Sequence, residues 1–177
     1  MILMKVILLY GLPCSGKSSV IQALPACYRL AVDDVIKNHS ADPSIEDFGC
    51  LSKALVTELI TKIDGLASDC YVIEMGCLIH QTAINHLQES LIKMGAEYIN
   101  ITLHAHDNVL INRITERNRL IEQGLSDSFP IEGPDYLSRF KKVFEKHKPV
   151  NSIELDTSEI DVNKVLLEVK QIIRTRD

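Results

Sequence analysis

The stretch MKVILLYGLPCSGKSS, residues 4–19, decides the fold. Residues 4–10 are a short, largely apolar run, typical of a strand covered on both faces. A turn with two glycines follows, and a helix is predicted to open near Lys17. The segment GLPCSGKS, residues 11–18, fits the pattern G-x-x-x-x-G-K-[ST] between a strand and a helix, the context that this pattern requires. We therefore predict a loop that binds phosphate groups.

Each residue type in this loop has a physical reason. Gly11 and Gly16 allow backbone angles and a close approach that a Cβ would block. The N–H groups of the loop then point inward as a cradle for an anionic phosphate. Lys17 is expected to reach the β and γ phosphates of ATP in catalysis, and Ser18 to bind Mg²⁺. The alternative is a chance turn rich in glycine and serine. The residues expected here to bind the nucleotide are Gly11, Leu12, Pro13, Cys14, Ser15, Gly16, Lys17, Ser18 and Ser19.

The rest of the chain alternates between strands and helices. Further strands are predicted at 28–32, 71–75, 97–103 and 152–156, and apolar residues at steps of three and four predict helices. A helix rich in arginine is predicted at 107–119. The alternation favours a parallel sheet with helices on both faces, which places its ligand at the carboxyl ends of the strands.

Length and composition favour one α/β domain over residues 1–177, with 46% hydrophobic and 24% charged residues. The net charge is −5, so a nucleic-acid partner, which would need a local basic patch, is not expected. The opening apolar run is too short for a signal peptide, and no stretch approaches the roughly 18 apolar residues of a membrane span. We expect no membrane partner, and a monomer or a homodimer.

Five cysteines, an odd number, lack a CxxC pair or the spacing of a zinc site. This usage predicts reduced thiols in a cytoplasmic protein. Cys14, inside the loop, is either a somewhat reactive thiol or an inert spacer.

Two acids, Asp33 and Asp34, directly follow the second predicted strand. A kinase that acts on a hydroxyl needs a carboxylate to position that hydroxyl and accept its proton. We expect Asp33 in this role, and Asp34 to cap the next helix or to contact Mg²⁺ through water. The alternative is that both acids only cap the helix.

Several segments together resemble a known group of enzymes. GLPCSGKSS, VDD after the second strand, VIEMG on the third, ITLHAHDNVLINRITERNR and LDTS look like the small P-loop kinases. That group includes shikimate kinase, gluconate kinase, chloramphenicol phosphotransferase and the kinase domain of polynucleotide kinase. The resemblance implies a three-layer P-loop NTPase fold, a five-stranded parallel sheet in the order 2-3-1-4-5, and a small lid at about residues 117–135. It also implies ATP and Mg²⁺ as cofactors.

The same resemblance implies roles for further residues. In these kinases the first acid after strand two, here Asp33, is the usual catalytic base. An arginine at the position of Arg113 lies by the nucleotide. One at the position of Arg117 stands at the start of the lid segment that covers the phosphates. A guanidinium there matches the charge of the transferring phosphoryl group. Asp156 and Thr157, in LDTS, match the loop that flanks the adenine ring.

Weaker signals keep their alternatives. For Glu74, at the end of the third strand, three roles are open: it holds Mg²⁺ through water, it contacts the acceptor, or its carboxylate only stabilises the fold. Arg119 belongs either to the site or to a solvated charged face with Glu116. His104 and His106 have no third ligand for a metal and are interpreted as surface residues.

The acceptor is the least determined part. No arginine occurs between Arg29 and Arg113, which counts against shikimate and against a strongly anionic acceptor. We expect transfer of the γ-phosphate of ATP to a hydroxyl of a small molecule: a neutral alcohol, a nucleoside or an antibiotic-like compound. The alternatives are a nucleotide-binding regulatory NTPase and a polynucleotide 5′-hydroxyl kinase. TKID at 61–64, the candidate guanine-recognition motif, is predicted to lie inside a helix, the wrong place for it.

Overall fold

The computed structural model describes residues 4–24, 28–32, 34–35, 47–65, 68–77, 79–126, 130–131, 134–159 and 161–174. Strands and helices alternate through these ranges, as the hydrophobic pattern predicts. They are β1 Lys5–Gly11, α1 Lys17–Ala23, β2 Tyr28–Ala31, α3 Asp47–Asp64, β3 Cys70–Glu74, α4 Gln81–Lys93, β4 Glu97–His104, α5 Asp107–Glu122, α6 Pro134–His147, β5 Ile153–Asp156 and α7 Val162–Arg174.

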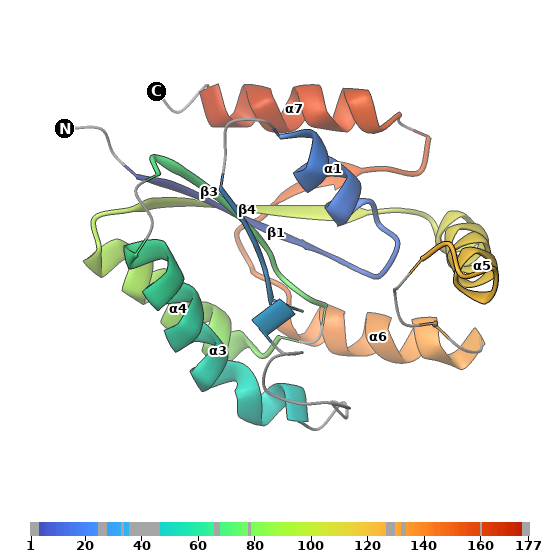
Figure 1. The fold of residues 1–177 in the computed structure, drawn as a ribbon, viewed down its shortest axis with the longest axis horizontal. Helices are drawn as coiled ribbons and strands as arrows, with labels where there is room; N and C mark the ends of the chain where they lie inside the picture. Colours follow the sequence, from blue (N-terminus) through green and yellow to red (C-terminus); the bar gives the residue numbers. More distant parts are fainter. Residues whose placement is uncertain are drawn as a thin grey trace.

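The five strands of the described residues form one sheet in the order β2-β3-β1-β4-β5, and every neighbouring pair is parallel. This confirms the predicted fold class and strand order. Helices α1 and α7 cover one face of the sheet, and α3, α4 and α6 cover the other (Figure 1). The predicted strand limits differ from the observed ones by one residue at one or both ends.

Alternate side chains of β1 enter two separate hydrophobic cores. Val6, Leu8 and Tyr10 join the core under α3, α4 and α6. Ile7 and Leu9 join the core under α1 and α7. All five are at most 1% exposed, which is why this strand reads as a continuous apolar run and not as an alternating one.

Two observations concern the expectations about cysteines and membranes. Cys14 is a free thiol, but Cys70 is disulfide-bonded, so the expectation of reduced thiols is wrong for Cys70. Among the residues described, no helix is both long and apolar enough to cross a membrane.

Candidate active site

The loop of residues 11–18, called the phosphate loop below, connects β1 to α1 at the carboxyl edge of the sheet. Gly11 lies so close to its neighbours that a Cβ there would be 2.5 Å from Leu103 O and from Ser15 Oγ. Gly16 has open space around it but a φ of 99°, a conformation that side chains disfavour. Gly11 has a φ of 149°, so this position needs glycine both for close approach and for backbone conformation, whereas Gly16 needs it for conformation alone.

The side chain of Lys17 folds back over this loop and is only 8% exposed. Its Nζ donates hydrogen bonds to Gly11 O over 2.8 Å and to Leu12 O over 3.0 Å. Backbone carbonyls compensate the charge only in part, because each carries a partial negative charge. A phosphate oxygen would be a stronger partner for the same ammonium group.

Ser15 lies at the base of the loop and is completely buried. Its Oγ has no hydrogen-bond partner within the described part of the chain. This unpartnered hydroxyl, the buried ammonium group of Lys17 and a glycine that admits no Cβ belong to one loop, and such a set of groups fits an anionic phosphate. The residues present thus suit the nucleotide that the sequence motif predicts.

A carboxylate stands beside the predicted magnesium ligand. Ser18 is exposed in the first turn of α1, and its Oγ donates to Glu74 Oε1 over 3.0 Å. Mg²⁺ bound with nucleotide phosphates needs only one or two protein oxygens, with water supplying the rest. The absence of any group of three metal-binding His, Cys, Asp or Glu side chains among the described residues is compatible with that arrangement. Ser18 and Glu74 would hold such an ion.

Of the two acids that follow β2, the structure describes only Asp34. Asp33, the expected base, lies outside the described residues. Asp34 is exposed beyond the end of β2. Because Ala31 pairs with Glu74, Asp34 lies past the same carboxyl edge as Glu74. Its role at Mg²⁺ stays a prediction.

Arg113 of α5 reaches the phosphate loop from outside. Its Nη1 donates to Cys14 O over 3.3 Å and to Thr157 Oγ1 over 3.2 Å, and its Nη2 donates to Thr157 O over 2.6 Å. Cys14 has a φ of 61°, so the loop turns sharply where the guanidinium holds it. The family resemblance implies a place by the nucleotide for Arg113, which stays a prediction; the bonds to Cys14 and Thr157 show in addition that Arg113 connects two loops.

Thr157 is buried beneath the phosphate loop, with 4% of its surface exposed. Its Oγ1 lies 3.0 Å from Ser15 O and 3.0 Å from His104 O, and its backbone N donates to His104 O over 2.8 Å. The neighbouring Asp156 points the other way, since its Oδ1 accepts a bond from Ser158 N over 2.8 Å.

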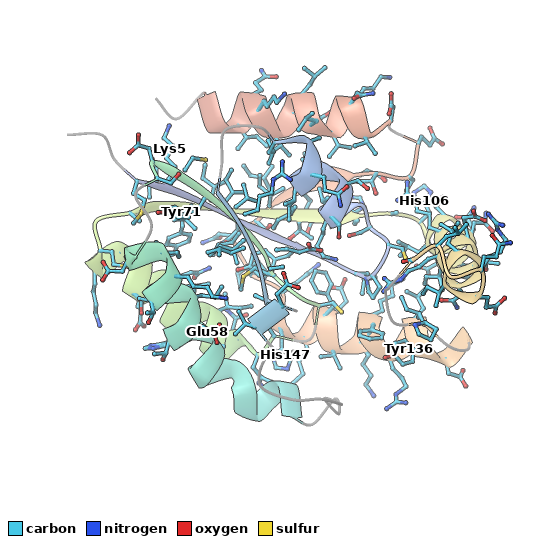
Figure 2. All side chains as sticks on the ribbon, in the orientation of Figure 1. Lys5, Glu58, Tyr71, His106, Tyr136 and His147 are labelled. Carbon is cyan, nitrogen blue, oxygen red and sulfur yellow. The ribbon has the colours of Figure 1, made fainter. Side chains whose placement is uncertain are left out.

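The Asp156 carboxylate also lies near two histidines, His104 and His106, which the sequence analysis interprets as surface residues. His104 Nδ1 lies 4.0 Å from Asp156 Oδ1, and His106 Nε2 lies 3.8 Å from Asp156 Oδ2. Hydrogen bonds from Ser158, followed by the two histidines, hold the pKa of the Asp156 carboxyl below its usual range. All three side chains are substantially exposed, at the edge where His106 lies beside α5 (Figure 2).

Two arginines of the later part of α5 have separate environments. Arg117 is half-buried. Arg119 is exposed, and its Nη2 contacts Glu116 Oε1 over 2.6 Å, so the bond between them lowers the pKa of Glu116. Of the two readings of Arg119, the solvated charged face is the one that this ion pair supports.

The helix α5 continues to Glu122, three residues beyond the predicted end at 119. Past it, Gly124 has a φ of 70°. Farther along, Asn118 holds Ile131 by two bonds: Asn118 Nδ2 donates to Ile131 O over 2.7 Å, and Ile131 N donates to Asn118 Oδ1 over 3.0 Å. The predicted lid falls here, and residues 127–129 and 132–133 of it lie outside the described residues.

A cavity of about 270 Å³ lies between α6 and the carboxyl ends of β4 and β5, with Leu12 of the phosphate loop in its wall. Its cationic side chains already have partners. Lys141 Nζ lies 2.8 Å from Asp107 Oδ1, and Lys148 Nζ lies 2.9 Å from Glu145 Oε2. Paired lysines offer an anionic acceptor little free charge.

No protein-family model and no curated protein matches this sequence. Solved structures match over nearly the whole chain. A proposed kinase from Chloroflexus aurantiacus is 19% identical, with a TM-score of 0.65, over 99% of this chain and 98% of its own. A sugar kinase from a Janibacter species is 14% identical, with a TM-score of 0.63, over 96% and 93%.

The tunicamycin resistance protein of Deinococcus radiodurans is also similar, at 12% identity and a TM-score of 0.59, over 96% of this chain and 95% of its own. At such identities a likeness shows the fold. The chain shares its fold with solved structures named as kinases, which confirms at the level of the fold the resemblance that the sequence motifs carry.

Proposed function

We propose that this chain is an ATP-dependent phosphotransferase that moves the γ-phosphate of ATP to a hydroxyl of a small molecule. One observation carries the proposal: the phosphate loop holds the buried Lys17 ammonium group against two of its own carbonyl oxygens, Gly11 O and Leu12 O. Bound ATP would supply the phosphoryl group, with Mg²⁺ at Ser18 and Glu74 to neutralise its charge. Kinase names among the structural neighbours support the same class of reaction.

The chain's own residues would divide the work. Lys17 would exchange the carbonyl oxygens of Gly11 and Leu12 for phosphate oxygens. We assign to Asp33 the positioning and deprotonation of the acceptor hydroxyl, and to Arg117 the charge that develops during transfer. A lid at about residues 117–135 would exclude water from the reacting groups.

For the acceptor we propose a neutral or partly apolar alcohol, such as a nucleoside or an antibiotic-like compound. The sequence supports this choice, because no arginine follows Arg29 until Arg113 to bind a strongly anionic acceptor.

A guanine-specific switch has less support. The TKID segment at 61–64 lies within α3, and Ile63 is 1% exposed in the core. The motif's Lys62 and Asp64 lie at the end of α3, which leads into the amino end of β3, whereas the phosphate loop follows the carboxyl end of the neighbouring strand β1. A base-recognition motif would have to lie at the same edge of the sheet as the phosphate loop. A cytoplasmic location and a monomeric or homodimeric state stay predictions.

The test is a screen of ATP turnover against a panel of alcohols, with the phosphorylated products identified by mass spectrometry. Lys17→Ala should abolish product formation, because the loop then loses the ammonium group that would bind the phosphate oxygens. Lys93→Ala, at the exposed end of α4, is the matched control and should leave turnover unchanged. ATP binding without transfer to any alcohol would favour a regulatory NTPase instead.

A further inference from the structure

A phosphate loop that points its N–H groups inward must also provide hydrogen-bond donors for the carbonyl oxygens that then point outward. A trans peptide points its N–H and its C=O in opposite directions, and the described residues contain no cis peptide. Each N–H that faces a phosphate therefore turns the carbonyl oxygen of the same peptide away from it. A buried carbonyl oxygen needs a donor, since leaving it unpaired costs as much as a lost hydrogen bond.

The structure shows which donors the outward carbonyls use. Ser15 O is contacted by Thr157 Oγ1 over 3.0 Å, and Cys14 O by Arg113 Nη1 over 3.3 Å. The peptide that carries Ser15 O also carries the N–H of Gly16, the residue just before Lys17. A donor at Ser15 O thus fixes the direction of the Gly16 N–H.

The inward partners differ from the outward ones. Lys17 bonds Gly11 O and Leu12 O, and it can leave them for a phosphate. Thr157 has no such alternative, because it is buried and Arg113 holds both its carbonyl and its hydroxyl oxygen. Its single hydroxyl proton has two acceptors within 3.0 Å, Ser15 O and His104 O. Because His104 O already accepts a bond from Thr157 N, the proton contributes more at Ser15 O.

We propose that Thr157 is a positioning residue: its hydroxyl, oriented by Arg113, sets the Ser15–Gly16 peptide so that the Gly16 N–H faces the phosphates. The inference rests on the proposed function, since it assumes that the loop binds a nucleotide. It differs from the adenine-flanking role that the sequence resemblance implies. Thr157 acts through the loop backbone, on the phosphate half of the ligand.

A ligand without adenosine distinguishes the positioning role of Thr157 from the adenine-flanking role, because such a ligand contacts only the phosphate loop. We would measure the dissociation constants of Mg²⁺–ATP and Mg²⁺–tripolyphosphate by isothermal titration calorimetry for the parent and for Thr157→Val, which keeps the shape and removes the hydroxyl. A positioning role predicts that both ligands bind about tenfold more weakly, because the loop loses a buried hydrogen bond. Thr157→Ser, which restores the hydroxyl, should recover both constants to within about twofold.

Ser158→Ala is the matched control, because it removes a hydroxyl from the same loop. Ser158 Oγ accepts a bond from His106 N over 2.8 Å, so it holds the start of α5 and not the phosphate loop. Both dissociation constants should stay at the parent value in this variant.

Each other outcome decides against the inference. A loss with ATP alone would place Thr157 against the adenosine half, and no loss with either ligand would make its hydroxyl irrelevant to the loop. A parent protein that binds neither ligand would overturn the proposed function together with this inference. If circular dichroism shows that Thr157→Val does not fold, Thr157→Ala takes its place in both titrations.

Discussion

Ser18 Oγ donates a hydrogen bond to Glu74 Oε1 over 3.0 Å, which joins the first turn of α1 to the end of β3. The two residues are far apart in sequence and meet because β1 and β3 are neighbours in the sheet, with Leu9 opposite Glu74. A hydroxyl and a carboxylate so placed would supply two oxygens to a divalent cation bound there.

Glu74→Gln should raise the Mg²⁺ concentration needed for half-maximal activity by about tenfold, because the amide keeps the shape but loses the charge. A Mg²⁺ titration of turnover at saturating ATP measures the change. Glu89→Gln, on the exposed face of α4, should leave the titration curve in place. An unchanged curve in Glu74→Gln would leave this carboxylate as an acceptor contact or a structural group.

Asp33→Asn should lower kcat by roughly 10²–10⁴-fold with nearly unchanged ATP affinity, since general-base assistance has that typical size. Asp34→Asn should cost less, because Asp34 is not the assigned base and asparagine caps a helix as well as aspartate does. The comparison requires kcat and the ATP dissociation constant of both variants on one identified acceptor. If Asp34→Asn is the inactive variant, the assignment is displaced by one residue.

Arg117→Ala should lower kcat far more than nucleotide affinity, because a guanidinium over the transferring group acts on charge that develops in the transition state. Arg119→Ala is the control on the same helix, and the exposed ion pair with Glu116 predicts a small effect. Steady-state kinetics and ATP titrations of both variants test the difference. Equal losses of kcat and affinity in Arg117→Ala would contradict a role specific to the transition state.

Cys14→Gly should stabilise the fold by up to about 1 kcal/mol, because Cys14 holds a φ of 61° that glycine adopts without a Cβ penalty. Part of the gain is offset by the greater freedom of glycine in the unfolded chain. Cys14→Val should destabilise, since a β-branched side chain tolerates this conformation poorly. Urea unfolding of the three proteins measures the free energy of unfolding. A less stable Cys14→Gly would mean that thiol packing outweighs backbone strain.

The sequence predicted those features that depend on neighbours along the chain. The phosphate loop is recognisable because Gly11, Gly16 and Lys17 must stand at fixed spacing between a strand and a helix. The helix α5 was predicted to end at 119, yet it reaches Glu122, because the last turn carries no residue that breaks a helix until Gly124.

Contacts between distant strands were harder to predict. Asp156 meets His104 and His106 only because β4 and β5 lie side by side, with His104 opposite Asp156. The alternate spacing of the two histidines at a strand end was visible, but their carboxylate partner was not. Likewise, nothing in the motif LDTS shows that Thr157 turns inward to the phosphate loop while Asp156 turns outward.

The position of β1 between β3 and β4, with a core on each face, has a consequence for hydrogen exchange. Amides of residues 6–10 cannot reach solvent by fraying of an edge, so their exchange should require opening of the whole sheet. The phosphate loop continues this strand, so a bound nucleotide would have to leave before the strand opens. The exchange rate should therefore fall as the fraction of unbound protein falls. The exchange rates of the slowest amides of β1, measured at several nucleotide concentrations, would then give the affinity for the nucleotide before any acceptor is known.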